Sequence, residues 1–149
     1  MAVSFALVGG KPLVVTFIPG LFLAWGIFAW LHFSRSALPK GGSLYPVYYA
    51  VLAWQFVHFF EEYVTGFRIL FPALYGATAY SDALFLGINM LSYFVFAASF
   101  ILAFEVGQKF LLIPVLFFVV YGALGNAIAH VWWSVTTGGY FPGLVTALA

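Results

Sequence analysis

Cysteine is absent from this sequence, and charged residues are scarce. Of 149 residues, 6% are Asp, Glu, Lys or Arg, and the formal net charge is +1. The lack of cysteine excludes a disulfide framework, cysteine-ligated zinc and a thiol nucleophile. Soluble domains carry about 25% charged residues, so this chain could not cover a globule with polar surface. These shortages exclude a soluble enzyme, a disordered tail and a nucleic-acid binder, which needs a basic face.

Apolar residues, in contrast, are abundant: 65% of the chain is hydrophobic and 22% is aromatic. A membrane-spanning helix needs ~20 mostly apolar residues in a row. Four stretches meet this need, at about 13–33, 45–67, 83–104 and 110–135. They are continuous and too long for the alternating strands of a membrane β-barrel. We therefore predict an all-α, polytopic membrane helical bundle with four transmembrane helices, forming a single membrane domain over residues 1–149 in the lipid bilayer.

The basic residues in the loops predict an orientation. The loops after the first and third predicted helices share one membrane side and carry Arg35, Lys40 and Lys109. The other side carries Lys11 and Arg68. The positive-inside rule then predicts that both termini lie outside the cytoplasm. We expect a multi-pass protein of a prokaryotic plasma membrane.

Polar side chains inside the predicted spans are the informative ones. Ionisable groups there cost about 2.5–3.5 kcal/mol each on insertion scales, so they usually face the interior and serve a function. The second helix carries His58, Glu61 and Glu62, which helical spacing places on one face. The fourth carries Asn126 and His130, four residues apart. Helices two and four run in the same direction, and both groups lie at the same depth at 1.5 Å per residue. We therefore predict a shared His/Glu/Asn pocket.

Three short motifs follow one another along the chain. They are His58-x-x-Glu61-Glu62, Asn126-Ala127-x-x-His130 and Tyr140-x-Pro142-Gly143-x-x-Thr146. Together, in this order and on this hydropathy, they resemble the motifs of the HXXEE family of multi-pass membrane proteins. The resemblance runs from the second predicted helix to the C-terminus. It implies an HXXEE domain in a small helical bundle, and it brings no established reaction. Family members usually continue into another hydrophobic stretch, so we expect a fifth helix to be missing or truncated at the C-terminus.

Two histidines and one or two glutamates at helical spacing suit a divalent transition metal, Zn, Fe or Mn. We predict His58, Glu62 and His130 as the metal ligands. Glu61 would be the base or a fourth ligand, and Asn126 and Tyr140 would orient groups. We predict that Glu62 takes part in the reaction as well as binding the metal. The predicted catalytic residues are therefore Glu61, Glu62, Asn126 and Tyr140. The best hypothesis is an intramembrane, metal-dependent enzyme that acts on a lipid or other hydrophobic substrate.

Other interpretations use the same residues. A buried His/Glu pair could exchange protons with a substrate without a metal, as in an acid–base isomerase. A row of Glu, His and Asn could relay protons or bind a cation in a transporter or channel subunit. Taken singly, Glu61 could be the solvated end of helix two, and His130 could be an interface histidine beside Trp132 and Trp133. The chain could also form an oligomer.

Overall fold

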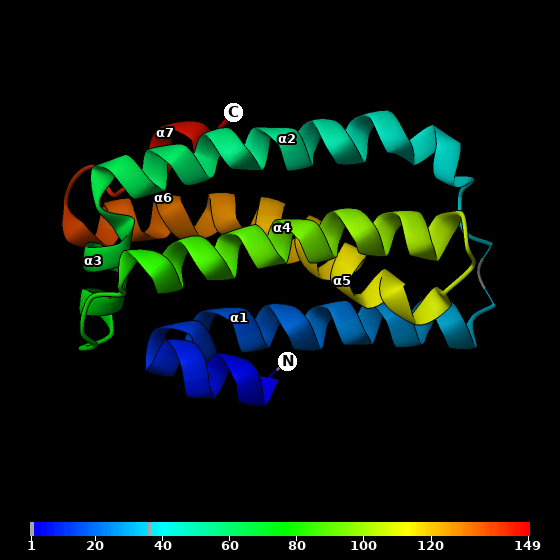
Figure 1. The fold of residues 1–149 in the computed structure, drawn as a ribbon, viewed down its shortest axis with the longest axis horizontal. Coiled ribbons are helices and arrows are strands. Elements are labelled where there is room, and N and C mark those ends of the chain that lie inside the picture. The colour runs from blue at the N-terminus through cyan, green and yellow to red at the C-terminus, as the bar shows by residue number, and fades with distance from the viewer. Residues whose placement is uncertain (1, 36) are drawn as a thin grey trace.

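The computed structural model describes residues 2–35 and 37–149. All regular structure in these residues is helical, which confirms the all-α prediction. The helices, in chain order, are α1 (Ala2–Phe33), α2 (Gly41–Thr65), α3 (Phe67–Leu74), α4 (Asp82–Phe104), η1 (Lys109–Leu111), α5 (Leu112–Phe117), η2 (Phe118–Gly125), α6 (Asn126–Thr137) and α7 (Leu144–Ala147). The long helices lie side by side along the longest axis of the molecule (Figure 1).

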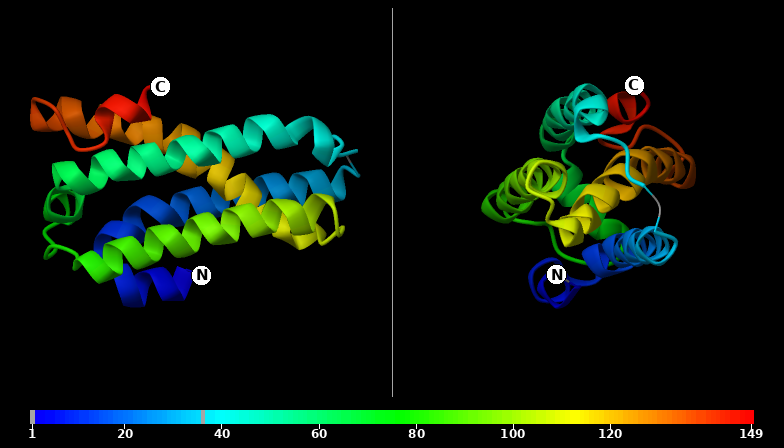
Figure 2. Two further views of the ribbon diagram at one scale, coloured as in Figure 1. Left: turned by 45° about the horizontal axis from the view of Figure 1, so that its top comes forward. Right: turned by 90° about the vertical axis from the view of Figure 1, so that its right-hand side faces the viewer.

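Two pairs of long segments run in opposite directions through the bundle. The chain passes along α1, returns along α2, crosses again along α4 and returns through α5, η2 and α6 (Figures 1 and 2). Consequently α2 and α6 run the same way. The short helix α3 lies at the end where both of them finish, and α7 folds back beside α2 (Figure 1). This path brings the second and third of the sequence motifs alongside the first.

Three helical segments are long and apolar enough to cross a membrane: Gly10–Phe33, Asp82–Phe104 and Lys109–Thr137. Each corresponds to one of the predicted spans, so the chain is a membrane protein with three candidate spans among the described residues. The remaining predicted span, the second at about 45–67, lies in α2, which is not among these segments. Polar residues in its second half, Gln55, His58, Glu61 and Glu62, lower its hydropathy.

Local sequence explains where several helices begin and end. Ser81 caps α4, because its Oγ accepts a hydrogen bond from the Leu84 amide at 3.2 Å. Gly66 ends α2 in the left-handed conformation, with φ 89°, and so lets α3 turn away. The fourth predicted span is not a uniform α-helix, since residues 118–125 form a π-helical stretch. Such stretches are rare and frequently occur at functional sites.

Aromatic residues fill the core between α2, α4 and the α5–η2 segment. The rings of Tyr48 and Phe100 stack with centroids 4.2 Å apart, and those of Phe96 and Phe118 lie 5.1 Å apart. The hydroxyl of Tyr48 donates to the Phe96 carbonyl at 3.1 Å, and that of Tyr49 donates to a neighbouring carbonyl of α4 at 3.0 Å. Each such bond contributes about 0.5–1.5 kcal/mol net. Packing and hydrogen bonds together fix the position of α2 against α4.

Candidate metal centre

Three ionisable side chains meet inside the bundle where α2 faces α6. His58 and Glu62 project from α2, and His130 projects from α6. One ligand atom from each of the three lies within 4.8 Å of the others. Glu62 Oε1 is 3.4 Å from His58 Nε2 and 3.2 Å from His130 Nε2. All three residues are buried, with exposed fractions of 2%, 7% and 0% for His58, Glu62 and His130.

His130 is buried among aromatic rings, and its ring nitrogens lack hydrogen bonds. Phe67 and Trp133 lie against it, with ring centroids 5.4 and 5.1 Å away, and the ring of His58 is 4.8 Å away. Neither Nδ1 nor Nε2 has a hydrogen-bond partner among the described residues. The approach of Nε2 to Glu62 is close enough for an ion pair but falls outside hydrogen-bond geometry. A buried polar group without a partner costs about 1–3 kcal/mol, so this nitrogen pair needs an explanation.

His58, in contrast, has partners on both sides of its ring. Asn126 Nδ2, from the start of α6, donates to His58 Nε2 at 2.7 Å. On the other side, His58 Nδ1 lies 3.0 Å from the hydroxyl of Thr146. Since Nε2 accepts, Nδ1 carries the proton and donates to the Thr146 oxygen. The lone pair of Nε2 is therefore taken up by the Asn126 amide, and the same nitrogen lies 3.4 Å from Glu62 Oε1.

Glu61 turns away from the three buried groups and binds the C-terminal segment. Its Oε1 accepts from the Tyr140 hydroxyl at 2.6 Å and from the Val145 amide at 3.1 Å. Its Oε2 accepts from the Thr146 amide at 2.8 Å and from the Thr146 hydroxyl. The result is a continuous path of hydrogen bonds from His58 through Thr146 to Glu61. Partial burial and the hydrogen bond to Glu61 both raise the pKa of Tyr140, which keeps that hydroxyl protonated as a donor.

The C-terminal segment also covers the buried groups directly, at Gly143. This glycine has φ 89°, a conformation that other residues rarely adopt. A Cβ atom placed there would lie 2.5 Å from His130 Cε1, 2.9 Å from Glu62 Cγ and 2.9 Å from His58 Cε1. No side chain fits between the backbone and the cluster. The segment is anchored further by Phe141, whose amide donates to Ser134 Oγ at 3.1 Å.

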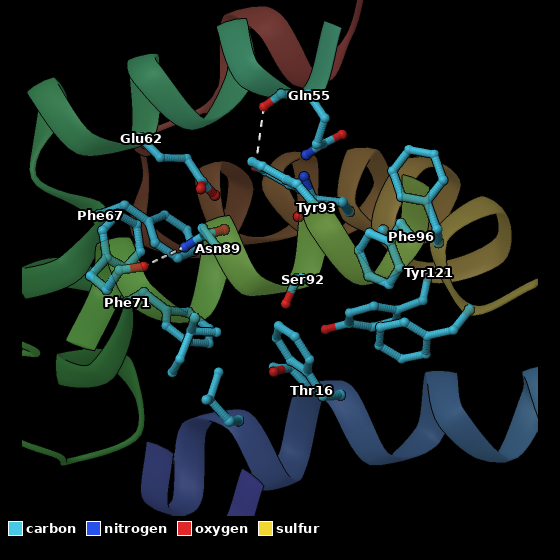
Figure 3. A pocket seen from close by; sticks show the side chains of 18 of the residues that line it. Thr16, Gln55, Glu62, Phe67, Phe71, Asn89, Ser92, Tyr93, Phe96 and Tyr121 are labelled. Carbon is cyan, nitrogen blue, oxygen red and sulfur yellow. Dashed lines mark hydrogen bonds between the residues drawn. The ribbon is translucent and has the colours of Figure 1, made fainter. Parts of the chain in front are cut away.

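A cavity of about 110 Å³ opens beside the cluster, between α1, α2, α4 and η2. Glu62 and Asn126 reach its wall, and Figure 3 shows Glu62 pointing from α2 into the space across which Thr16 of α1 lies. Most of the remaining lining is aromatic: Phe67, Phe71, Phe85, Tyr93, Phe96 and Tyr121. A few polar groups interrupt it, including Asn89 and Ser92 (Figure 3). The cluster therefore borders a small, mostly apolar space.

The predicted site residues all lie in or next to this cluster. His58, Glu62 and His130 form it, and Asn126 touches it through one hydrogen bond. Glu61 and Tyr140 lie on its outer side and meet each other there rather than the buried groups.

Sequence reasoning overlooked Trp54, whose Nε1 donates to the Thr146 carbonyl at 2.9 Å and holds the C-terminal segment on α2. Its position one helical turn before His58 was the available signal.

Comparison with known proteins agrees with the sequence motifs. A family model described as "Protein of unknown function with HXXEE motif" matches residues 49–149. That range includes every residue of the cluster and the C-terminal segment that covers it. No curated protein and no solved structure matches the chain.

Proposed function

This chain belongs to the HXXEE family, as its motifs predicted, and we propose that it is an intramembrane, metal-dependent enzyme acting on a hydrophobic substrate. One divalent transition metal would be held by His58, Glu62 and His130. The observation that carries the proposal is the buried group of three donors in which His130 has two unpartnered ring nitrogens. A metal on one of these nitrogens would supply the interaction that the described residues do not provide.

The two separations that involve Glu62 support a metal of ordinary size. Two ligands that each lie ~2.1 Å from a tetrahedral zinc are about 3.4 Å apart. Glu62 Oε1 is 3.4 Å from His58 Nε2 and 3.2 Å from His130 Nε2. A set of two imidazoles and one carboxylate suits Zn, Fe or Mn. Three protein ligands leave at least one coordination position for water or substrate, which is typical of catalytic rather than structural sites.

The surrounding hydrogen bonds support the same assignment. A metal-bound histidine usually donates its second ring N–H to an oxygen, which fixes its tautomer and orientation. His58 Nδ1 has this arrangement, with Thr146 between it and the Glu61 carboxylate. We assign Glu61 and Thr146 as positioning residues. Asn126 now donates to Nε2, and a half-turn of its amide would direct Oδ1 to the metal as a further oxygen ligand.

The cavity beside Glu62 supports a substrate with an apolar part. Aromatic rings form most of its wall, so water gains little there and hydrocarbon is favoured. Pockets that enclose a whole drug-sized molecule measure roughly 300–1,000 Å³. At about 110 Å³, this cavity accepts only a segment of a lipid, next to the metal ligands. A metal held by His58, Glu62 and His130 would supply Lewis-acid polarisation and would lower the pKa of water, which is the chemistry that hydrolysis needs.

The bilayer placement that we propose includes α2 as a fourth span. This helix has 25 residues, which corresponds to about 37 Å and exceeds the ~30 Å hydrocarbon core. It lies alongside α4 along the length of the bundle (Figure 1). Its polar groups, His58 and Glu62, are buried against α6 instead of facing lipid. Polar side chains that face the protein interior avoid the free-energy cost of contact with lipid, which a hydropathy average counts in full.

Elemental analysis of the full chain, purified in detergent, tests the metal. We expect about one equivalent of a transition metal, lost in His58→Ala and in Glu62→Gln because each removes a ligand. Glu105→Gln is the matched control, since Glu105 is an exposed carboxylate that follows α4 outside the cluster. Less than about a tenth of an equivalent in the wild type, unchanged by His58→Ala, would refute the metal centre.

Reconstitution into liposomes separates catalysis from transport. The enzyme hypothesis predicts turnover of a bilayer lipid or an added fatty ester that disappears in Glu62→Gln and persists in Glu105→Gln. A proton or cation flux that disappears in Glu62→Gln, without any turnover, would instead identify a transporter. Turnover that survives removal of the metal would identify metal-free acid–base chemistry at the same residues.

A further inference from the structure

A second cavity lies at the opposite end of the bundle from the metal centre. It measures about 550 Å³ and is bounded by the last turns of α1, the linker to α2 and the beginning of η1 and α5. In Figure 1 this is the end where the linker between α1 and α2 and the turn after α4 meet. The candidate spans end at Phe33 and begin at Lys109 here, so the cavity lies at the level of a membrane surface.

The polar part of this cavity is basic. Arg35 and Lys109 line it together with His32, and no carboxylate is among the lining residues. The ion pairs of the described residues do not include Arg35 or Lys109. Glu105, the nearby acid in the sequence, lies instead beside Gly41 at the start of α2. Two positive charges thus face one space, and among the described residues no carboxylate is paired with either of them.

The rest of the cavity wall is apolar and continues toward lipid. Phe28 and Leu31 of α1 and Leu112 of α5 form it, and the ring of His32 stacks on Phe28 with centroids 6.1 Å apart. On the same end of α1, Phe33 is largely exposed, as expected of an aromatic residue in the headgroup region. A ligand that fits must join an anionic group to hydrocarbon.

The backbone at Arg35 provides a second, independent observation. Among the described residues, Arg35 is the one residue other than glycine with positive φ, at 49°. It follows the C-terminus of α1, where glycine is the usual residue because it adopts this conformation without strain. A large cationic side chain at a backbone position that favours glycine is consistent with a function for the guanidinium group.

We propose that this cavity binds the phosphate headgroup of an anionic phospholipid. The guanidinium of Arg35 and the ammonium of Lys109 would contact the phosphate oxygens, and the acyl chains would lie along Phe28, Leu31 and Leu112. Basic pockets between transmembrane helices bind acidic headgroups in this way. Charge complementarity and the apolar wall both favour a lipid over a free anion. The site is separate from the metal centre, so neither proposal depends on the other.

Lipid binding to the full chain in neutral detergent tests this proposal. The protein is titrated with phosphatidylglycerol or with phosphatidylcholine of the same acyl chains, and bound lipid is counted by native mass spectrometry. We expect at least about tenfold tighter binding of phosphatidylglycerol, because each basic group near an anionic lipid strengthens binding about fivefold. Equal affinity for the two lipids would overturn the proposal.

Two lysines on the same membrane face give a matched pair of variants. Lys109 lines the cavity, whereas Lys40, the residue before α2, is exposed and does not line it. We expect Lys109→Gln to weaken phosphatidylglycerol binding about fivefold and Lys40→Gln to change it less than twofold. Equal losses would indicate diffuse attraction to the whole face and would overturn a specific site. Competition by inorganic phosphate at millimolar concentration would assign the cavity to a free anion and would also overturn it.

Discussion

Substitution of Gly143 by alanine probes the contact between the C-terminal segment and the metal centre. The added methyl group would lie 2.5 Å from His130 Cε1 and 2.9 Å from both Glu62 Cγ and His58 Cε1. Separations under 3.0 Å require atoms to move, and each atom at risk belongs to a proposed metal ligand. The substitution therefore forces either the segment or the ligands out of position.

Two contributions make up the expected cost. A residue other than glycine in the left-handed region costs about 1–2 kcal/mol, and Gly143 has φ 89°. An extra methyl group in a close-packed site costs about 1–3 kcal/mol more. Gly138→Ala isolates the first contribution, because Gly138 has φ 76° but no atom within 4 Å of its added Cβ. The difference between the two variants, about 1–3 kcal/mol, measures the contact alone.

Thermal unfolding and chelator competition in detergent measure this difference. We expect Gly143→Ala to be less stable than Gly138→Ala without metal, and to bind the metal about tenfold to a hundredfold more weakly, at 1.4 kcal/mol per factor of ten. The stability comparison tests the packing even if no metal binds. Equal stability and equal metal affinity in the two variants would refute the close approach of Gly143 to the cluster.

Three further substitutions test other contacts of the site and the fold. Thr146→Val removes the hydroxyl between His58 and Glu61, so metal affinity measured by chelator competition should fall roughly tenfold, whereas Thr146→Ser should retain it. Ser134→Ala leaves the buried Phe141 amide without its acceptor and should lower the free energy of unfolding by about 1–3 kcal/mol, with wild-type stability as the contradicting result. Asp82→Asn breaks the 2.7 Å ion pair with Arg68, but both side chains are partly exposed, so a loss above about 1 kcal/mol would contradict our interpretation.

The approach of the polar residues of α2 to those of α6 could be predicted from sequence because it depends on few variables. Helical periodicity fixes that His58 and Glu62 share a face, as do Asn126 and His130. Short connections make successive spans antiparallel, so the second and fourth predicted spans, which contain α2 and α6, run in the same direction. Equal distances from the helix ends then give equal depth. The structure brings the rings of His58 and His130 to a centroid distance of 4.8 Å.

The different orientations of the Glu61 and Glu62 side chains were harder to predict from sequence. Helical spacing predicted both carboxylates on one face with His58, but adjacent residues on an α-helix point about 100° apart, so contacts with other segments decide where each one turns. Glu62 faces His130, while Glu61 faces the C-terminal segment. Two of the donors to Glu61 are backbone amides, of Val145 and Thr146. Backbone groups have no sequence signature, which is why the partner of Glu61 could not be derived from residue types alone.

The π-helical stretch η2 and the short helix α3 also escaped prediction. Apolar composition does not distinguish α- from π-helical bonding, since both satisfy every backbone group within one segment. Residues 118–125 form η2 directly before Asn126, so it adjusts the direction in which the polar face of α6 emerges. Similarly, the turn at Gly66 directs Phe67 inward against His130, although hydropathy alone would continue the preceding helix.

Docking of the C-terminal segment and metal binding should reinforce each other. The segment supplies the Thr146 oxygen that accepts a hydrogen bond from His58, and the backbone at Gly143 lies close to all three ligands. Whatever orients the ligands before the metal arrives reduces the ordering cost of binding, and a bound metal stabilises the docked segment by the same free energy. Phe141 and Pro142 are buried, so undocking also exposes apolar surface. Metal should therefore protect the amides of Phe141 and Thr146 from hydrogen exchange, while amides of α4 near Glu105 should remain unaffected. Equal protection with and without metal would show that the segment is held by packing alone.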